Sequence, residues 1–534
     1  MDGAASIIAS TESPGQRLRR RAYETLPLLV CLLAVAFLSV RINKGIYLGD
    51  EGAVCMGGWR ISQGETPNAD FFQIETPLSF YLEGWTFDVF GPSVLADRSL
   101  GFVYGLLLVA LVYALAGVLL RSPLLRAAAL SALIPFGVGA WPFPSHHWLV
   151  DLCQLACLWC LFAGIRSSRT GWMVLGGVLA VAGALSLEDQ GLYGLIAASI
   201  LLPATLPPLH RLRLSLGWLG GVCAAGLAAI VLLLSKMPLG QLWYDWAVFP
   251  LTQYGGGQGS MWAAAGGWSD IVRGLTWSGF SAYPFYISVT LLSYGLLCFL
   301  PLLAAAGAAF CLKARWPSLQ LAGALVAIGA AFLGCAAHRW SIMNLTWASP
   351  GLVLVVAVAA DGLWEARHSW ARFTVRGVAT LCLLVFGAFG VAGLWHQSTS
   401  PQYTIFAPAG SLTTFDGRQA NALQEFINAI GHEVPPGAPA FCWGYIPMVN
   451  FLTEHPNPTP FNLMVTSPPY NSARQVSSWI KALDRDSVQW GFSHAFPVQP
   501  GDPAAAYLKA NYAPAWTNGA YTLWRRKSQY PFPR

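Results

Sequence analysis

The sequence predicts an α-helical polytopic membrane protein with about eleven transmembrane helices and a small C-terminal extracytoplasmic α/β domain. Of the 534 residues, 55% are hydrophobic and 10% are charged, whereas a soluble protein carries roughly 25% charged residues. The 23 tryptophans and 28 phenylalanines suit a chain that crosses the two membrane interfaces many times. Long apolar stretches recur up to residue 395, after which the chain becomes polar.

Residues 1–23 are predicted to be a cytoplasmic N-terminal tail, and residues 24–395 the transmembrane domain. A helix needs about 20 apolar residues to cross the hydrocarbon of a bilayer. The candidate spans are residues 24–41, 98–120, 124–142, 146–165, 171–187, 191–209, 214–235, 286–312, 318–337, 346–364 and 374–395.

The charges of the loops give an independent prediction of topology. If the N-terminus is cytoplasmic, the inside loops are 121–126, 166–171, 210–215, 313–318 and 365–376, and every one of them contains arginine. This is the arrangement that the positive-inside rule requires. A first outer loop at 42–97, a long outer loop at 236–285 and the tail from residue 396 then lie on the other side of the membrane.

The tail, residues 396–534, is expected to form the extracytoplasmic domain. Residues 423–430 and 473–483 have helical spacing of apolar side chains, while residues 521–526 alternate as a strand does. Proline-rich turns separate these segments. The mixture predicts a compact α/β unit.

The first outer loop carries three acids, Asp50, Glu51 and Glu75. Thr76 is a candidate cap for a helix with Pro77 at its first position, and the apolar residues that follow have helical spacing. We expect two interfacial helices that frame a cavity, with the three acids at its rim. The alternative is that these acids cap helices or face water.

Further polar side chains gather at the outer ends of the spans. Each group also has an ordinary structural interpretation, as an interfacial anchor, a solvated turn or a snorkelling side chain. A charge in a span is costly at mid-membrane, which favours a cavity-facing role for Asp151. The residues concerned are His146, His147, Asp151, Glu188, Asp189, Gln190, His338, Arg339, Trp340 and Asn344.

The first outer loop and the second span resemble those of the GT-C membrane glycosyltransferases. The resemblance rests on Asp50-Glu51 and on "FFQIETPLSFYLEGWTFDVFGPSVLADRSLG" (71–101). It is strongest toward the branch that contains the bacterial lipid A aminoarabinose transferases and the protein O-mannosyltransferases. Such enzymes move a sugar from a polyprenyl-phosphate carrier to an acceptor on the extracytoplasmic side.

The resemblance implies roles for individual residues. Asp50 matches the acid proposed as the general base, Glu51 its neighbour, and Glu75 the acid before the proline. Where the aminoarabinose branch reads Glu-Lys-Pro-Pro, this chain reads Glu-Thr-Pro-Leu at 75–78, so the carrier phosphate must find its cation elsewhere. The candidates for the phosphate or lipid are Arg339, whose guanidinium presents paired donors, and His338, His146, His147 and Arg60.

The remaining outer polar residues are candidates for binding the sugar or the acceptor, namely Glu75, Asp151, Glu188, Asp189, Gln190, Trp340 and Asn344. The reaction requires no cofactor, and a divalent cation (Mg²⁺ or Mn²⁺) held by Asp50, Glu51 and Glu75 is left open.

The expected partners are a polyprenyl-phosphate-linked sugar donor, membrane lipids, and a lipid, glycan or protein acceptor. The net charge of +6 is scattered over short loops, which argues against nucleic acid. The location expected is a bacterial inner membrane, with a eukaryotic endomembrane as the alternative. The alternative function is a multi-spanning transporter or flippase of a lipid-linked or small polar substrate, which would place acids or broken helices at the bilayer midplane.

Overall fold

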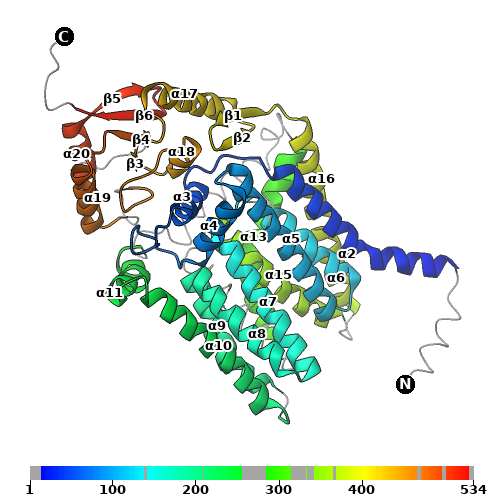
Figure 1. Cartoon of the computed structure of the whole chain (residues 1–534). Helices are drawn as coiled ribbons and strands as arrows, with labels where there is room; N and C mark the ends of the chain where they lie inside the picture. The colour runs from blue at the N-terminus through cyan, green and yellow to red at the C-terminus, as the bar shows by residue number, and fades with distance from the viewer. Residues whose placement is uncertain are drawn as a thin grey trace, which may run out of the picture.

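The computed structural model describes residues 14–137, 141–206, 208–254, 284–313, 332, 342–364, 369–465, 471–495 and 501–527. Most of these residues are helical, and the long helices form one bundle (Figure 1). The bundle comprises α2 (Pro14–Arg41), α5 (Val94–Leu119), α6 (Pro123–Phe136), α7 (His146–Ser167), α8 (Thr170–Ser186), α9 (Glu188–Thr205), α10 (Arg211–Leu234), α13 (Pro284–Lys313), α15 (Ile342–Trp364) and α16 (Ser369–Thr399).

Each of these helices coincides with a predicted span. The ninth predicted span, residues 318–337, lies outside the described residues except for Phe332. Within the described ranges, six helices are long and apolar enough to cross a membrane, namely α2, α5, α7, α10, α15 and α16. Helices α6 and α8 are apolar but shorter. The chain is a multi-pass membrane protein, and the total of eleven crossings stays a prediction.

The first outer loop forms the two expected helices, α3 (Asp50–Ser62) and α4 (Leu78–Phe90). The prediction that Thr76 caps α4 was wrong, because Pro77 occupies the N-cap position and the Thr76 hydroxyl donates to Ala184 O at 3.0 Å. Helix α4 buries Glu83 and exposes apolar Trp85, Val89 and Phe90. An outward apolar stripe is what a helix lying in the membrane interface requires.

Short π-helical elements follow α10 in the long outer loop. Its described part, residues 236–254, contains α11 (Leu239–Trp243), η1 (Tyr244–Val248) and η2 (Pro250–Tyr254). The buried carboxylate of Asp245 accepts from Asn68 Nδ2 at 3.1 Å and from Gln241 Nε2 at 2.9 Å. The bond from Asn68 joins the first outer loop to the long outer loop.

The C-terminal region is the predicted α/β unit. Its helices are α17 (Gly417–Glu433), α18 (Pro447–Leu452), α19 (Ala473–Arg485) and α20 (Pro503–Asn511), and its strands are β1 (Tyr403–Ala407), β2 (Gly410–Thr414), β3 (Ala440–Trp443), β4 (Trp490–His494), β5 (Tyr512–Thr517) and β6 (Tyr521–Arg526). Strands β1 and β2 form a hairpin, and the others form a sheet of order β3-β4-β6-β5 in which only β3 and β4 run parallel. The helical and strand patterns read from the sequence lie in α17, α19 and β6.

The C-terminal region packs directly on the first outer loop. One apolar core contains Cys55 and Met56 of α3 together with Met448, Val449 and Phe451 of α18. In Figure 1, α3, α11 and the C-terminal strands lie on the same side of the molecule. A topology with residues 42–97, 236–285 and 396–534 on one side of the membrane requires this arrangement.

Candidate active site

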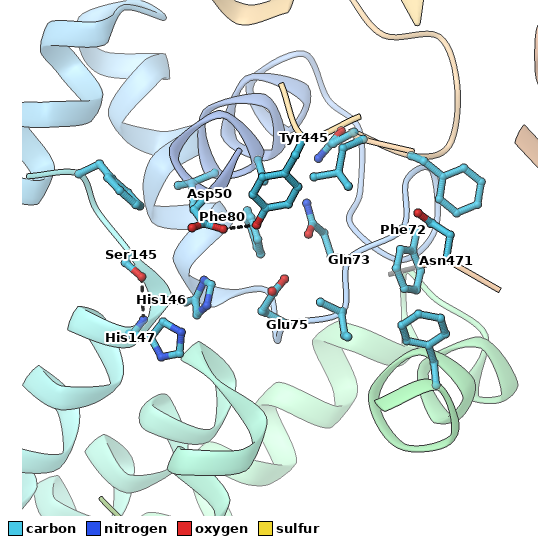
Figure 2. A pocket seen from close by; sticks show the side chains of 18 of the residues that line it. Asp50, Phe72, Gln73, Glu75, Phe80, Ser145, His146, His147, Tyr445 and Asn471 are labelled. Carbon is cyan, nitrogen blue, oxygen red and sulfur yellow. Dashed lines mark hydrogen bonds between the residues drawn. The ribbon is translucent and has the colours of Figure 1, made fainter. Parts of the chain in front are cut away.

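A cavity of about 420 Å³ lies where α3, the amino end of α7 and the C-terminal region meet. Asp50 opens α3 on one wall, and Gln73 and Glu75 come from the segment between α3 and α4. His146 and His147 begin α7 on another wall (Figure 2). The first outer loop, the start of α7 and the C-terminal region, which are far apart in sequence, therefore all contribute polar side chains to this cavity.

Asp50 is the best-placed acid in this cavity. It occupies the first turn of α3, where the helix dipole favours negative charge, and its side chain is half-buried. The Tyr445 hydroxyl donates a hydrogen bond to Asp50 Oδ1 (Figure 2). Asp50 thus presents a half-buried, hydrogen-bonded carboxylate to the cavity.

The structure does not support a catalytic role for Glu51. Its side chain is fully buried and pairs with Arg98 through Arg98 Nε to Oε1 and Nη2 to Oε2, the second bond being 2.7 Å long. Glu51 does not line the cavity. Successive residues of a helix point about 100° apart, so Asp50 and Glu51 face different surroundings.

The two histidines come together at the cavity wall. Ser145 caps α7, accepting from His147 N at 3.3 Å. The ring centroids of His146 and His147 lie 4.4 Å apart. The His147 ring stacks on the Trp347 ring with a centroid distance of 3.5 Å. Both side chains line the cavity, beside the positive end of the α7 dipole.

Other predicted residues divide between the cavity and the protein interior. Glu75 and Asn344 line the cavity. Arg60 does not; it is buried and pairs with Glu65 at 2.6 Å. A phosphate-binding role for Arg60 stays a prediction, and this cavity does not support it. His338, Arg339 and Trp340 lie outside the described residues.

The polar residues at the turn between α8 and α9 also lie outside the cavity lining. Gln190 Nε2 donates to Asp151 Oδ1 at 2.6 Å, and both residues are fully buried. The Asp189 carboxylate accepts from Gln190 N at 2.5 Å, and Glu188 accepts from Thr76 N at 3.2 Å. Gln190 therefore joins α9 to α7, and Glu188 joins α9 to the first outer loop. The predicted sugar or acceptor binding of these four residues stays a prediction.

Sequence reasoning missed the wall that the C-terminal region supplies. Tyr445, Asn462 and Asn471 line the cavity, together with Phe461. The Asn462 Nδ2 atom is buried without a hydrogen-bond partner, although its Oδ1 accepts from Arg60 at 3.2 Å. Only the glycine before Tyr445, with φ of 107°, marks a sharp turn that the sequence signals.

The three acids proposed as cation ligands do not meet. Glu51 is paired with Arg98 away from the cavity, whereas Asp50 and Glu75 line it. In the described part of the chain, no group of three or more histidine, cysteine, aspartate or glutamate side chains has a metal-binding arrangement.

A cluster of buried acids lies behind α3. Glu51, Glu83 and Asp97 are all fully buried, and Arg98 is the cation beside them. Burial raises the pKa of Glu83 to about 8, and the charge of Glu51 contributes to the rise. Near neutral pH the folded protein therefore keeps a proton within this cluster of acids.

This proton makes stability depend on pH. An unfolded glutamate titrates near pH 4.3, so between that pH and about 8 the folded state binds the extra proton. Stability is greatest below this window and falls as pH rises through it.

We expect the apparent melting temperature to fall between pH 5 and 9. Glu83→Gln should flatten this slope and raise the melting temperature at pH 9, whereas exposed Glu433→Gln should leave the slope unchanged. A Glu83→Gln slope equal to that of the wild type would contradict the assignment.

Comparison with known proteins supports one fold. No protein-family model matches the sequence, and no curated protein matches it significantly. The crystal structure of ArnT from Cupriavidus metallidurans bound to undecaprenyl phosphate matches with a TM-score of 0.56 and 14% identity over 96% of this chain and 99% of that one. The apo form of that protein matches with a TM-score of 0.57 and 14% identity over 97% and 100%.

A third structure, the arabinosyltransferase EmbB from Mycobacterium smegmatis, has 13% identity over 70% of this chain and 41% of that one. Its TM-score of 0.35 is too low to indicate a shared fold. The two ArnT structures, in contrast, match over nearly the whole of both chains. This chain therefore has the ArnT fold, and its resemblance to the GT-C glycosyltransferases is confirmed at the level of the fold.

Proposed function

We propose that the protein is a glycosyltransferase that moves a sugar from a polyprenyl-phosphate carrier to an acceptor on the extracytoplasmic side of the membrane. The observation that carries the proposal is the position of Asp50, which faces a cavity with His146 and His147 in a chain with the fold of ArnT. ArnT has been crystallised with undecaprenyl phosphate, which makes a polyprenyl phosphate the natural carrier to test.

The chemistry suits the cavity. Asp50 would take the proton from the acceptor hydroxyl or amine as that atom attacks the anomeric carbon, and the bond to the carrier phosphate would break on the opposite face. A phosphate leaving group needs positive charge or hydrogen-bond donors rather than a strong acid. Among the described lining residues, the histidines at the start of α7 are the side chains that can become cationic. Arg339 remains a sequence-based proposal for the same role.

The rest of the cavity suits a hydroxyl-rich ring. Gln73, Asn462 and Asn471 offer amide donors and acceptors beside the rings of Phe72 and Phe249, whose centroids are 5.1 Å apart. Aromatic faces with a few polar groups are the usual lining of a ligand site. With Glu75 and Asn344, these groups would bind the sugar and the acceptor, which can be a lipid, glycan or protein.

The proposed side of the membrane follows from the basic inside loops, which place the cavity and the C-terminal region outside. An inner membrane of bacterial type is the proposed location. No cofactor is assigned to the reaction. A divalent cation in the cavity would contact the carboxylates of Asp50 and Glu75 but not that of Glu51.

The test is native mass spectrometry of the detergent-purified protein with added undecaprenyl phosphate. We expect a one-to-one complex, and retention of a polyprenyl-phosphate sugar from the cells would give the mass of the sugar. The double variant His146→Ala/His147→Ala should bind the added lipid about tenfold more weakly, since about 1.4 kcal/mol of phosphate contact is lost. The exposed His432→Ala should bind as the wild type does. Binding of ordinary phospholipid alone, together with substrate uptake into proteoliposomes, would contradict the proposal and favour a transporter.

A further inference from the structure

The C-terminal region reaches the proposed base through one side chain. Tyr445 lies between β3 and α18, and its hydroxyl donates to Asp50 Oδ1 across 395 residues of sequence. Figure 2 shows the phenol ring beside α3 with its oxygen directed at the carboxylate. The Asp50 carboxylate is therefore oriented by a residue from the far end of the chain.

The local packing is built to receive this ring. A Cβ atom added at Gly49 would lie 1.9 Å from the Tyr445 ring, so only glycine leaves room for the ring at this position. A Cβ added at Gly52 would lie 2.2 Å from Met448 N, and that same amide donates to Leu48 O at 3.1 Å. Backbone contacts on both sides of Asp50 thus fix the distance between α3 and the Tyr445 loop.

The apolar core makes this contact a stable one. Phe451 of α18 packs edge-on against Trp59 of α3 at 6.1 Å and stacks on Phe87 of α4 at 5.4 Å. The C-terminal region and the first outer loop therefore share one core. The packing of α18 on α3 therefore holds Tyr445 beside Asp50.

We propose that Tyr445 is a positioning residue for the transfer reaction, which directs one carboxylate oxygen of Asp50 toward the acceptor. The inference rests on the proposed role of Asp50 as the base. Because the Tyr445 hydroxyl occupies Oδ1, Oδ2 is the oxygen that would take the proton from the acceptor. The C-terminal region then completes the active site rather than serving as a separate binding module.

The matched test compares Tyr445→Phe with Tyr507→Phe. Each change removes a phenol hydroxyl of the C-terminal region that donates to a carboxylate. The Tyr507 bond to Asp484, 2.5 Å long, is exposed, however, and lies outside the cavity lining. We expect Tyr445→Phe to lower kcat for sugar transfer about 10- to 100-fold, the usual range for a hydrogen bond to a charged group. KM for the donor should not change, and Tyr507→Phe should behave as the wild type.

The division between kcat and KM separates positioning from a structural role. In Tyr445→Phe, kcat should fall while KM for the donor and the melting temperature stay at their wild-type values. A wild-type kcat would overturn the proposal. A lower kcat accompanied by a higher KM and a lower melting temperature would also overturn it, because it would mark a packing defect.

A second readout does not depend on transfer. The infrared carboxylate band of Asp50 can be isolated as the difference between the wild-type and Asp50→Asn spectra. Its frequency should shift in Tyr445→Phe, because the carboxylate loses a hydrogen-bond donor. An unchanged band would overturn the role of Tyr445 even in an active enzyme. A shifted band in a protein without transferase activity would instead show that the proposed function has failed while the Tyr445 contact stands.

Discussion

Asp50→Asn is expected to lower the rate of sugar transfer by about 10²- to 10⁴-fold, the contribution usual for a general base. Asparagine has nearly the same shape as aspartate, and its side-chain oxygen can still accept the Tyr445 hydrogen bond. The cavity and the carrier site should therefore remain intact. The measurement is transfer from a polyprenyl-phosphate sugar in detergent or liposomes, together with the melting temperature and lipid binding of the variant.

The matched control is Asp416→Asn. Asp416 also opens a helix, α17, where it accepts from Arg418 N and Gln419 N, and it does not line the cavity. The same change of charge at that helix terminus should leave transfer unchanged. Full activity of Asp50→Asn combined with an inactive Glu75→Gln would move the base to Glu75, the other carboxylate in the cavity.

The transmembrane helices could be predicted from the sequence for a simple reason. Backbone groups in lipid must be satisfied within the segment, so a long apolar stretch has one available structure. All the predicted spans that fall in described residues are helices. The α/β character of the tail followed from the change of period between α17 and β6. Neither pattern, however, indicates which face of a helix meets which neighbour.

The candidate site was only partly predictable, and Glu51 shows why. Because Asp50 and Glu51 are adjacent in sequence, we expected them to act together. In the helix, however, their side chains point about 100° apart, and Glu51 pairs with Arg98 in the protein interior. Gln190, at an outer turn, and Asp151, one turn below the outer end of its span, were likewise expected to bind sugar or acceptor, but in the structure they bond to each other. An acid at the mouth of a span can be a ligand or a packing element, and only its neighbours decide which.

Tyr445 and Asn462 illustrate the opposite error. Both lie about 400 residues after Asp50 in a region that the sequence describes only as a soluble α/β unit. Their arrival at the cavity depends on how α18 packs on α3, a contact between distant segments with no local signature. The glycines that make room for this contact, Gly49 and Gly52, were visible in the sequence but had no partner to explain them.

Arg98→Ala is expected to destabilise the protein by about 3–5 kcal/mol, because removing one member of a buried ion pair leaves the other charge without compensation. Arg98 and Glu51 are both fully buried, and the pair is bidentate. Arg98 also donates to the carbonyl oxygens of Lys44 at 3.0 Å and Gly45 at 3.1 Å. The Arg98 side chain therefore fixes both Glu51 and the backbone at Lys44 and Gly45, which leads into α3.

The measurement is the apparent melting temperature in detergent, with Arg485→Ala as the control. Arg485 also pairs with an acid, Asp486, but its side chain is 73% exposed, and exposed pairs contribute little to stability. Arg98→Lys should be destabilised as well, because an ammonium cannot reach both carboxylate oxygens and the loop carbonyls at once. A melting temperature of Arg98→Ala equal to that of the wild type would contradict the prediction. Glu51 follows Asp50 directly, so the loss of Arg98, the partner of Glu51, should also displace the proposed base. The rate of sugar transfer should therefore fall together with the melting temperature.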